Sequence, residues 1–267
     1  LIQGKFHWEP ISYYAVSQKS DSIIIPCLSD SDKKNAYLNL FLIHQGDTLS
    51  KNQYEFVIQN PYSLKSKFQS KHIGLFDISG ETEKLLKFFH IPYKKMNDLT
   101  EIRTKNFDLI IIANLDQNNE VPYNWEDVRN IASTGKPILL IHPGKHLKWL
   151  YPDKIQSIYE RKGRISHIII PEHPVFNHIL PEETAWWNSE KSEMPYSCRR
   201  SYRYSIKQKK SILPLAYYLR PHVYLSDPEK ELPEMSGYPL IEIREGKGKI
   251  IASELLLNNG VYDPIPG

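Results

Sequence analysis

The chain has 267 residues, of which 40% are hydrophobic and 12% aromatic. Because this composition supplies enough apolar surface for packed cores, it excludes an intrinsically disordered chain. The 34 basic and 31 acidic residues nearly cancel and leave a formal net charge of +3, which argues against a nucleic-acid-binding domain and predicts no nucleic-acid partner. The length allows one large domain or two smaller ones.

Three further features bear on compartment and partners. No apolar run approaches the length that spans a membrane, and no secretory signal peptide is present. The first residue is Leu1 rather than an initiator methionine, so we expect a piece of a longer polypeptide, whose location the missing signal peptide leaves open. Cys27 and Cys198 are the only cysteines, and we expect free thiols because a disulfide would have to join two different domains. The basic residues within 199–210 are interpreted as a solvated polar strand pair.

Residues 1–62 are predicted to form antiparallel β-structure. Residues 37–43 place alternate leucines on one face, turn residues follow at 44–47, and residues 54–58 return as the partner strand. A few strands of this kind cannot close a sandwich, so we expect the remnant of a β-sandwich domain whose earlier strands lie upstream. The polar, Lys- and Ser-rich residues 63–70 are predicted to form a linker.

Residues 71–267 are predicted to form a flavodoxin-like α/β domain. Apolar strands alternate here with amphipathic helices, which is the pattern of a parallel sheet covered on both faces. The expected strands are residues 72–78, 107–113, 137–142 and 165–170, and the expected helices are residues 81–90 and 125–133. Residues 240–255 are predicted to form a hairpin with a Gly-containing turn, which we expect to extend the sheet along one edge.

The strand at 137–142 is predicted to end in a sharp strand-to-helix elbow. Hydrolase-type α/β domains present a nucleophile at such an elbow, and acyl chemistry requires a thiol or hydroxyl there beside a base. The turn in this chain consists of His142, Pro143 and Gly144, so the reactive atom is missing. We therefore predict that no residue of this chain is catalytic.

Candidate ligand-binding residues lie where strands are expected to end. Asp77 follows the first strand of the α/β domain, and His142 and His146 flank the elbow. Pro143 and Gly144 break any helix between the two histidines, so shared metal ligation is disfavoured and no metal site is predicted. The chain has no Gly-rich nucleotide-binding motif, and no cofactor is predicted.

Trp186 and Trp187 form a second candidate site. Aromatic rings stack on sugars, and adjacent residues of an extended segment point to opposite faces, so one of the two indoles is expected to be exposed. The alternative for these residues, and for other tryptophans such as Trp125 and Trp149, is packing in a core.

Several segments together resemble a known family. Residues 172–187, 212–216 and 239–253 resemble the C-terminal, class I glutamine-amidotransferase-like domain of family 2 glycoside hydrolases of the β-galactosidase type. Residues 8–58 resemble the β-sandwich that precedes this domain. The motifs are a His-Pro-x-Phe turn, a Trp and a Gly-Lys-Gly hairpin. The domain is similar in layout to the β-galactosidase trimerisation domain and to ThuA-like proteins, and it usually lacks the Cys nucleophile, as the elbow here does.

The resemblance implies a parent enzyme that hydrolyses glycosidic bonds in a separate domain, and a periplasmic or extracellular location. The first hypothesis is a non-catalytic accessory region that braces the upstream catalytic domain, builds a homo-oligomer interface or shapes the substrate entrance. A carbohydrate-binding module that uses Trp186 or Trp187 is one alternative. A stand-alone hydrolase of ThuA or esterase type is the other, and it predicts that Asp77, His142 and His146 converge in one pocket.

Overall fold

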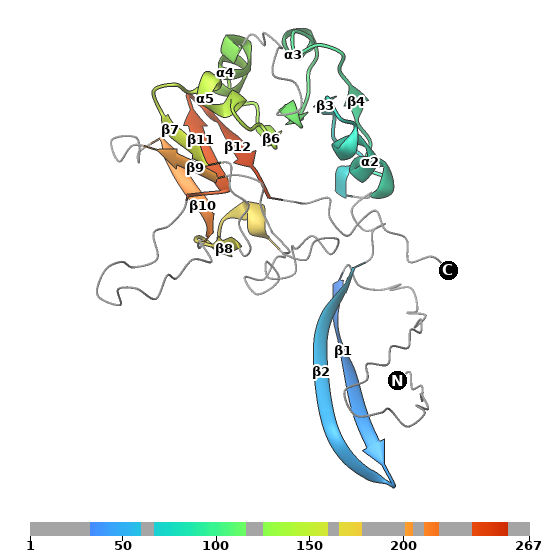
Figure 1. Ribbon diagram of the computed structural model, residues 1–267. Coiled ribbons are helices and arrows are strands. Elements are labelled where there is room, and N and C mark those ends of the chain that lie inside the picture. Colours follow the sequence, from blue (N-terminus) through green and yellow to red (C-terminus); the bar gives the residue numbers. More distant parts are fainter. Residues whose placement is uncertain are drawn as a thin grey trace, which may run out of the picture. The chain divides into compact units, whose positions relative to one another are not determined.

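The chain divides into two compact units, Leu1–Asn60 and Pro61–Gly267, and each is described by itself. The computed structural model describes residues 33–59, 67–115, 125–159, 166–177, 201–204, 211–218 and 237–255. Figure 1 shows the elements of both units. None of the helices in these ranges has the length and apolar character that crossing a bilayer requires.

The described residues of the first unit form an antiparallel hairpin of β1 (Lys33–His44) and β2 (Asp47–Gln59). Gln45 and Gly46 connect the strands with positive φ angles of 51° and 93°. This turn has the handedness that matches the twist of paired strands, and the glycine accepts it without strain. The predicted pairing of these two segments is therefore present. The upstream strands of the expected sandwich lie outside the described residues, so the sandwich remains a prediction.

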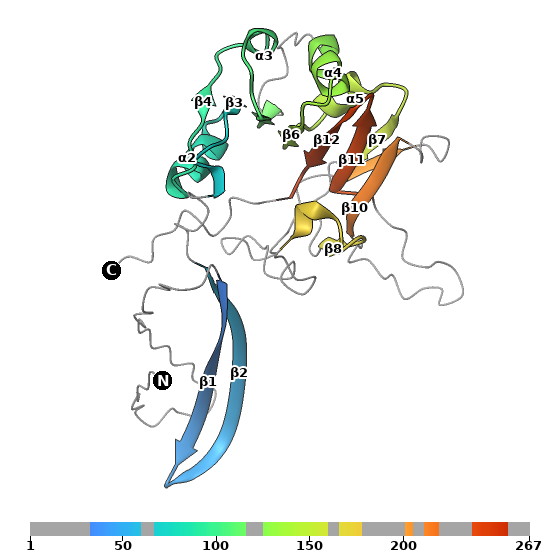
Figure 2. The ribbon, with the colours of Figure 1, turned by 180° about the vertical axis from the view of Figure 1, so that it is seen from behind.

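The second unit is built on a mixed eight-stranded sheet with strand order β4-β3-β5-β6-β12-β11-β10-β8. Figures 1 and 2 show it from opposite sides. In this order the strands are β4 (Lys94–Lys95), β3 (Ile73–Asp77), β5 (Leu109–Ala113), β6 (Ile138–Ile141), β12 (Gly248–Ser253), β11 (Leu240–Glu245), β10 (Ile212–Tyr218) and β8 (Ser166–Ile168). A separate two-stranded sheet pairs β7 (Ile155–Tyr159) with β9 (Ser201–Tyr204).

The strands from β4 to β12 are parallel, and the rest of the sheet is antiparallel. The predicted α/β character is confirmed, with two corrections in the connectivity. The segment 165–170 was expected to continue the parallel series, but β8 lies at the far edge and pairs antiparallel with β10. A parallel connection needs a crossover element, usually a helix, and α5 (His146–Leu150) leads instead into β7 of the separate sheet. Strand β12 occupies the parallel position beside β6. The hairpin 240–255 was expected along one edge of the sheet, but both of its strands lie inside it, between β6 and β10.

Helices cover both faces of the parallel strands. They are α2 (Glu81–Phe88), α3 (Glu101–Thr104), α4 (Trp125–Ser133) and α5, and a 3-10 turn, η2 (Pro174–Phe176), lies in the antiparallel part. Ile138 and Leu140 of β6 share a core with side chains of α3, α4 and α5, whereas Leu139 and Ile141 face the core that includes Leu86 of α2. Helix α2 therefore lies on one face of the sheet, and the other three helices lie on the opposite face.

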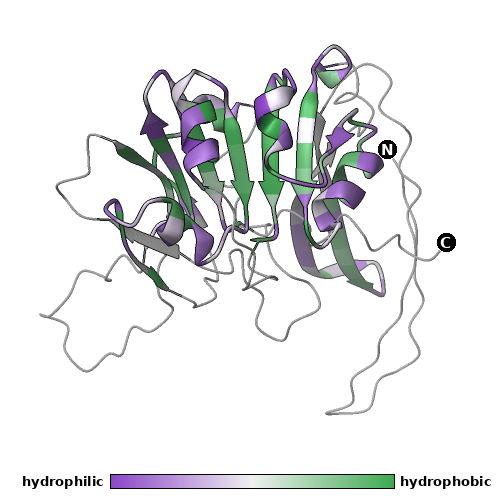
Figure 3. Cartoon of the chain, turned by 90° about the horizontal axis from the view of Figure 1, so that it is seen from above, coloured by the Kyte–Doolittle hydropathy of each residue, from purple (hydrophilic) through white to green (hydrophobic). Residues whose placement is uncertain are grey.

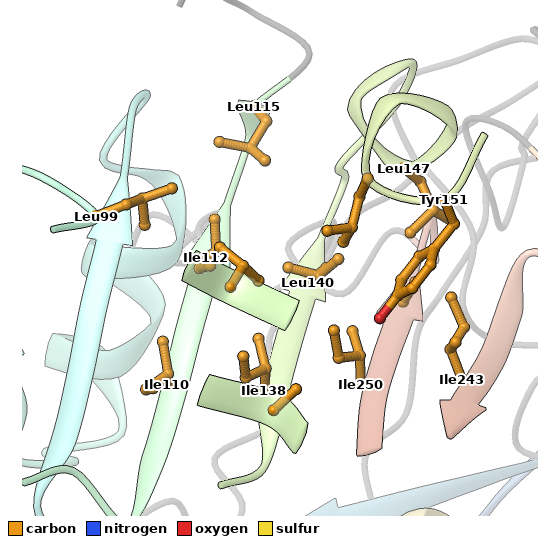
Figure 4. Close-up of a cluster of buried hydrophobic side chains, with 14 of the residues drawn as sticks. Leu99, Ile110, Ile112, Leu115, Ile138, Leu140, Leu147, Tyr151, Ile243 and Ile250 are labelled. Atoms are coloured by element: carbon orange, nitrogen blue, oxygen red, sulfur yellow. The ribbon is translucent and has the colours of Figure 1, made fainter. Parts of the chain in front are cut away.

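The larger core runs from β5 across β6 and β12 to β11, as Figure 4 shows for the isoleucines and leucines of these strands. Figure 3 shows that the hydrophobic colour is concentrated in the central strands, while the helices carry hydrophilic residues on their outer surfaces. A strand buried on both faces needs a continuous apolar run, and β5, with the sequence Leu-Ile-Ile-Ile-Ala, provides one.

The predicted Gly-containing hairpin is formed by β11 and β12, and its turn lies against the end of α4. The backbone amide of Lys247 donates to the carbonyl of Ser133 at 2.9 Å. A Cβ atom on Gly248 would lie 2.1 Å from the carbonyl oxygen of Ala132, closer than any real contact, so this position requires glycine. The close approach places β12 between β11 and β6 and thereby positions the residues that follow it.

Candidate functional site

Polar side chains collect at the edge where the parallel strands end. Asp77 ends β3, and Asn114, His142 and Glu254 directly follow β5, β6 and β12. Because the carboxyl ends of parallel strands meet at one edge of a sheet, these four residues lie along the same edge. All four are buried, with exposed fractions from 0% for Asn114 and Glu254 to 9% for Asp77. This edge is where open α/β sheets bind ligands, so we take it as the candidate site.

The elbow at the end of β6 has the strained backbone of a sharp strand-to-helix turn. His142 has a φ of 49° and Gly144 a φ of 55°, both in the left-handed region that side chains with a Cβ disfavour. The His142 ring donates from Nε2 to the carbonyl of Leu255 at 2.7 Å, and the His142 amide donates to the carbonyl of Ser253 at 2.8 Å. The elbow is thus tied to the end of β12 by both the backbone and the ring.

A buried glutamate side chain accepts a hydrogen bond from a backbone amide of the elbow. Glu254 Oε1 accepts a hydrogen bond from the Gly144 amide at 2.8 Å. The parallel register pairs Ser253 with Ile141, which brings the residue after β12 beside the residues after β6. In an acyl-transfer enzyme, a backbone amide near the elbow would be available to stabilise an oxyanion. Here the Gly144 amide is bound to a side-chain acceptor that the chain itself provides.

Asp77 serves mainly to hold the first turn of α2. Its Oδ2 atom accepts the amide of Glu83 at 2.8 Å, and its Oδ1 atom accepts Nδ2 of Asn114 at 2.9 Å and the hydroxyl of Ser79 at 3.4 Å. Asn114 Nδ2 also reaches the hydroxyl of Thr82 at 3.3 Å. The carboxylate therefore satisfies one of the orphan backbone donors at a helix start. Its negative charge, with Glu81 and Glu83 in the same turn, makes this end of the sheet unsuitable for phosphate.

His146 lies between two tryptophan side chains on the other side of the elbow. Its ring centroid is 5.7 Å from that of Trp125 at the start of α4 and 4.6 Å from that of Trp149 on α5. His146 is 1% exposed, whereas Trp149 is 50% exposed. The interplanar angle of 74° to Trp149 is an edge-to-face arrangement, which aromatic rings prefer. The histidine thus packs as part of an aromatic group.

Another buried carboxylate, that of Glu242, lies away from this edge, on β11. Burial opposes ionisation of Glu242, yet hydrogen bonds from Lys249 and His173 hold its pKa below the usual value. The His173 Nδ1 atom accepts the amide of Val175 at 3.2 Å, so Nε2 carries the proton that is donated to Glu242 at 3.1 Å. Since neither ring nitrogen is left to accept a proton from a substrate, we interpret this pair as a support for the turn η2.

The predicted ligand-binding residues have separate surroundings. Asp77 and His142 share the carboxyl edge, with β5 between their strands, and His146 packs against the tryptophans. Trp186 and Trp187 lie outside the described residues. Within the ranges that the structure describes, no three metal-ligating side chains come together. A ligand role for these five residues remains a prediction.

Sequence reasoning missed Asn114 and Glu254. It weighed Trp149 as a ring that could stack on a sugar against packing in a core, and it favoured packing for most of the tryptophans. The sequence contained a signal for Asn114 and Glu254, because both are polar and directly follow an apolar strand. Such residues gather at one edge of a parallel sheet. The position of residue 254 was hidden because β12 was expected to lie at the edge of the sheet. The exposure of Trp149 depends on how α5 packs, which the sequence does not specify.

No protein-family model matches the sequence, and no curated protein matches it. Among solved structures, the chain is similar to a cytoplasmic protein from Salmonella typhimurium, with 12% identity over 82% of this chain and 83% of that one, and a TM-score of 0.38. It is also similar to a β-galactosidase from Rahnella sp. R3, with 11% identity over 69% of this chain and 28% of that one, and a TM-score of 0.39. A carbohydrate deacetylase, Agd3, gives 9% identity over 69% of this chain and 29% of that one, with a TM-score of 0.41. Similarity at this level assigns no activity to the chain.

Proposed function

We propose that this chain is a non-catalytic accessory region of a glycoside hydrolase. Its second unit would be an amidotransferase-like α/β domain of the flavodoxin-like class. The strand order supports this class: numbered along the chain, the parallel strands β4-β3-β5-β6-β12 follow the order 2-1-3-4-5 of flavodoxin-like sheets. The link to glycoside hydrolases rests on the sequence resemblance.

The occupied elbow is the single observation that carries the non-catalytic part of the proposal. His142 has the left-handed backbone of a nucleophile elbow but carries an imidazole in place of a thiol or hydroxyl. The ring is bound to the carbonyl of Leu255, and the nearby Gly144 amide is bound to Glu254. An acyl intermediate would have neither a nucleophile nor this amide to form on. The elbow therefore functions as a structural joint between β6 and β12.

The proposed role is to brace the catalytic domain of the same polypeptide, to form a homo-oligomer interface or to shape the substrate entrance. A periplasmic or extracellular location belongs to the same proposal, because polysaccharide-degrading glycosidases of the resembled type are exported.

The test is hydrolysis of a panel of chromogenic glycosides by this chain and by the complete polypeptide that the proposal requires. We expect turnover by the complete polypeptide and none by the chain alone. Turnover by the purified chain that disappears in a His142→Ala variant would contradict the proposal and would support a hydrolase centred on the elbow. A variant of exposed Lys84 on α2, such as Lys84→Ala, is the matched control.

A further inference from the structure

Trp149 presents a large aromatic surface beside the elbow. It lies on α5 with half of its area exposed. In the described part of the second unit, the other large hydrophobic side chains that are exposed are Phe88 on α2 and Val175 on η2. Helix α2 belongs to the opposite face of the sheet, so it does not extend the same apolar surface. Among the described residues on its face of the sheet, Trp149 is therefore an exposed aromatic ring without an exposed aromatic neighbour.

The indole is held by its neighbours. His146 packs edge-to-face against it, with ring centroids 4.6 Å apart, and Trp125 contacts His146 from α4 at 5.7 Å. His146 is itself buried, so the group Trp125–His146–Trp149 connects the exposed indole to the core. A ring that is already ordered loses little conformational entropy when a ligand stacks on it, which is a property of a binding platform.

The exposed residues that lie near Trp149 in the sequence are mostly charged. Lys145, Lys148 and Asp153 are exposed in the same short stretch of chain, together with Pro152. A protein interface of ordinary size needs about 800 Å² per partner with a clustered apolar centre, which one indole does not provide. A pyranose ring fits better, because it offers polarised C–H groups to the negative face of an aromatic ring and hydroxyl groups to the polar rim.

From this combination we propose that Trp149 is a stacking platform for a carbohydrate chain, with His146 and Trp125 as positioning residues. The inference deepens the proposed function, on which it rests for the class of ligand. It assigns a sugar-binding residue in the described structure, distinct from Trp186 and Trp187. It also gives the accessory region a task, which is to hold a polysaccharide beside the catalytic domain.

Native gel electrophoresis through soluble galactan, arabinogalactan, xylan and mixed-linkage β-glucan tests the proposal. We expect at least one polysaccharide to retard the chain. Trp149→Ala should weaken the retardation by about tenfold, and Trp149→Tyr should retain part of it, because stacking contributes on this scale. Phe88→Ala, a change at an equally exposed aromatic residue on the opposite face, should have no effect. Circular dichroism confirms that each variant is folded.

Each outcome decides the inference separately from the proposed function. Retardation that depends on Trp149, without hydrolysis of chromogenic glycosides by the chain, supports both. Retardation that depends on Trp149 in a chain that does hydrolyse glycosides supports the platform and contradicts only the accessory role. The platform is overturned if none of the polysaccharides retards the chain or if Trp149→Ala is retarded as strongly as the unsubstituted chain. Self-association that Trp149→Ala abolishes, in the absence of polysaccharide binding, overturns it in favour of a protein interface.

Discussion

Replacing Glu254 tests whether the elbow is held by its internal carboxylate. The Glu254→Ala variant removes the acceptor for the Gly144 amide, which is bound at 2.8 Å and lies in a buried environment. The matched variant Glu254→Gln keeps a side-chain oxygen and nearly the same volume. Both substitutions remove the same ionisable carboxyl group, so the difference between them reports the loss of the acceptor and of side-chain volume.

The expected difference in unfolding free energy follows from two contributions. A buried amide donor left without a partner destabilises by about 1–3 kcal/mol. Truncation of a side chain that is 0% exposed also leaves a cavity, for which we add about 1 kcal/mol because part of the site relaxes. We therefore expect Glu254→Ala to be less stable than Glu254→Gln by about 2–4 kcal/mol.

Urea denaturation followed by far-UV circular dichroism measures this difference, provided that the two variants unfold with the same dependence on urea. Hydrogen exchange gives a local readout, since the Gly144 amide should exchange faster in Glu254→Ala and stay protected in Glu254→Gln. If the two variants differ by less than about 0.5 kcal/mol, within the usual range for surface changes, and the Gly144 amide exchanges equally in both, the internal hydrogen bond does not hold the elbow.

Two further predictions concern the scaffold of the site. Gly248→Ala should destabilise the second unit by more than about 3 kcal/mol, because the new methyl would meet the backbone of Ala132. The control is Gly80→Ala, where φ is 74° but the space around the residue is open, so the loss should be only about 1–2 kcal/mol. Equal losses of unfolding free energy in urea denaturation would contradict this contrast. Hydrogen bonds from Lys87, Lys95 and then Tyr93 lower the pKa of Glu83 from 4.5 to about 2. The corresponding stabilisation is present above pH 4.5 and is lost as the pH falls towards 2. Between these pH values, the unfolding temperature of Glu83→Gln should therefore depend less on pH than that of the unsubstituted chain. Added salt should reduce this difference, because both lysines are more than half exposed.

Local sequence determined the longer strands and helices in the first half of the second unit, although it did not predict the short β4 and α3. The run at 109–113 is apolar at every position, so a strand there must be buried on both faces. The structure has the strand β5 at these residues. Residues 125–133 have helical periodicity and end just before Gly135 and Pro137, and α4 occupies this range. The missing nucleophile at the elbow was also evident, because it depends only on which residues follow β6.

Tertiary structure decided which strands become neighbours and therefore which residues form the site. Residues 142 and 254 are far apart in sequence, and only the parallel pairing of β12 with β6 places Glu254 on the Gly144 amide. That pairing depends in turn on the close approach of Gly248 to α4, a contact that no local pattern encodes. The same holds for Trp149, whose exposure follows from the packing of α5. Periodicity is a property of neighbouring residues, whereas strand order and side-chain exposure depend on contacts between distant segments.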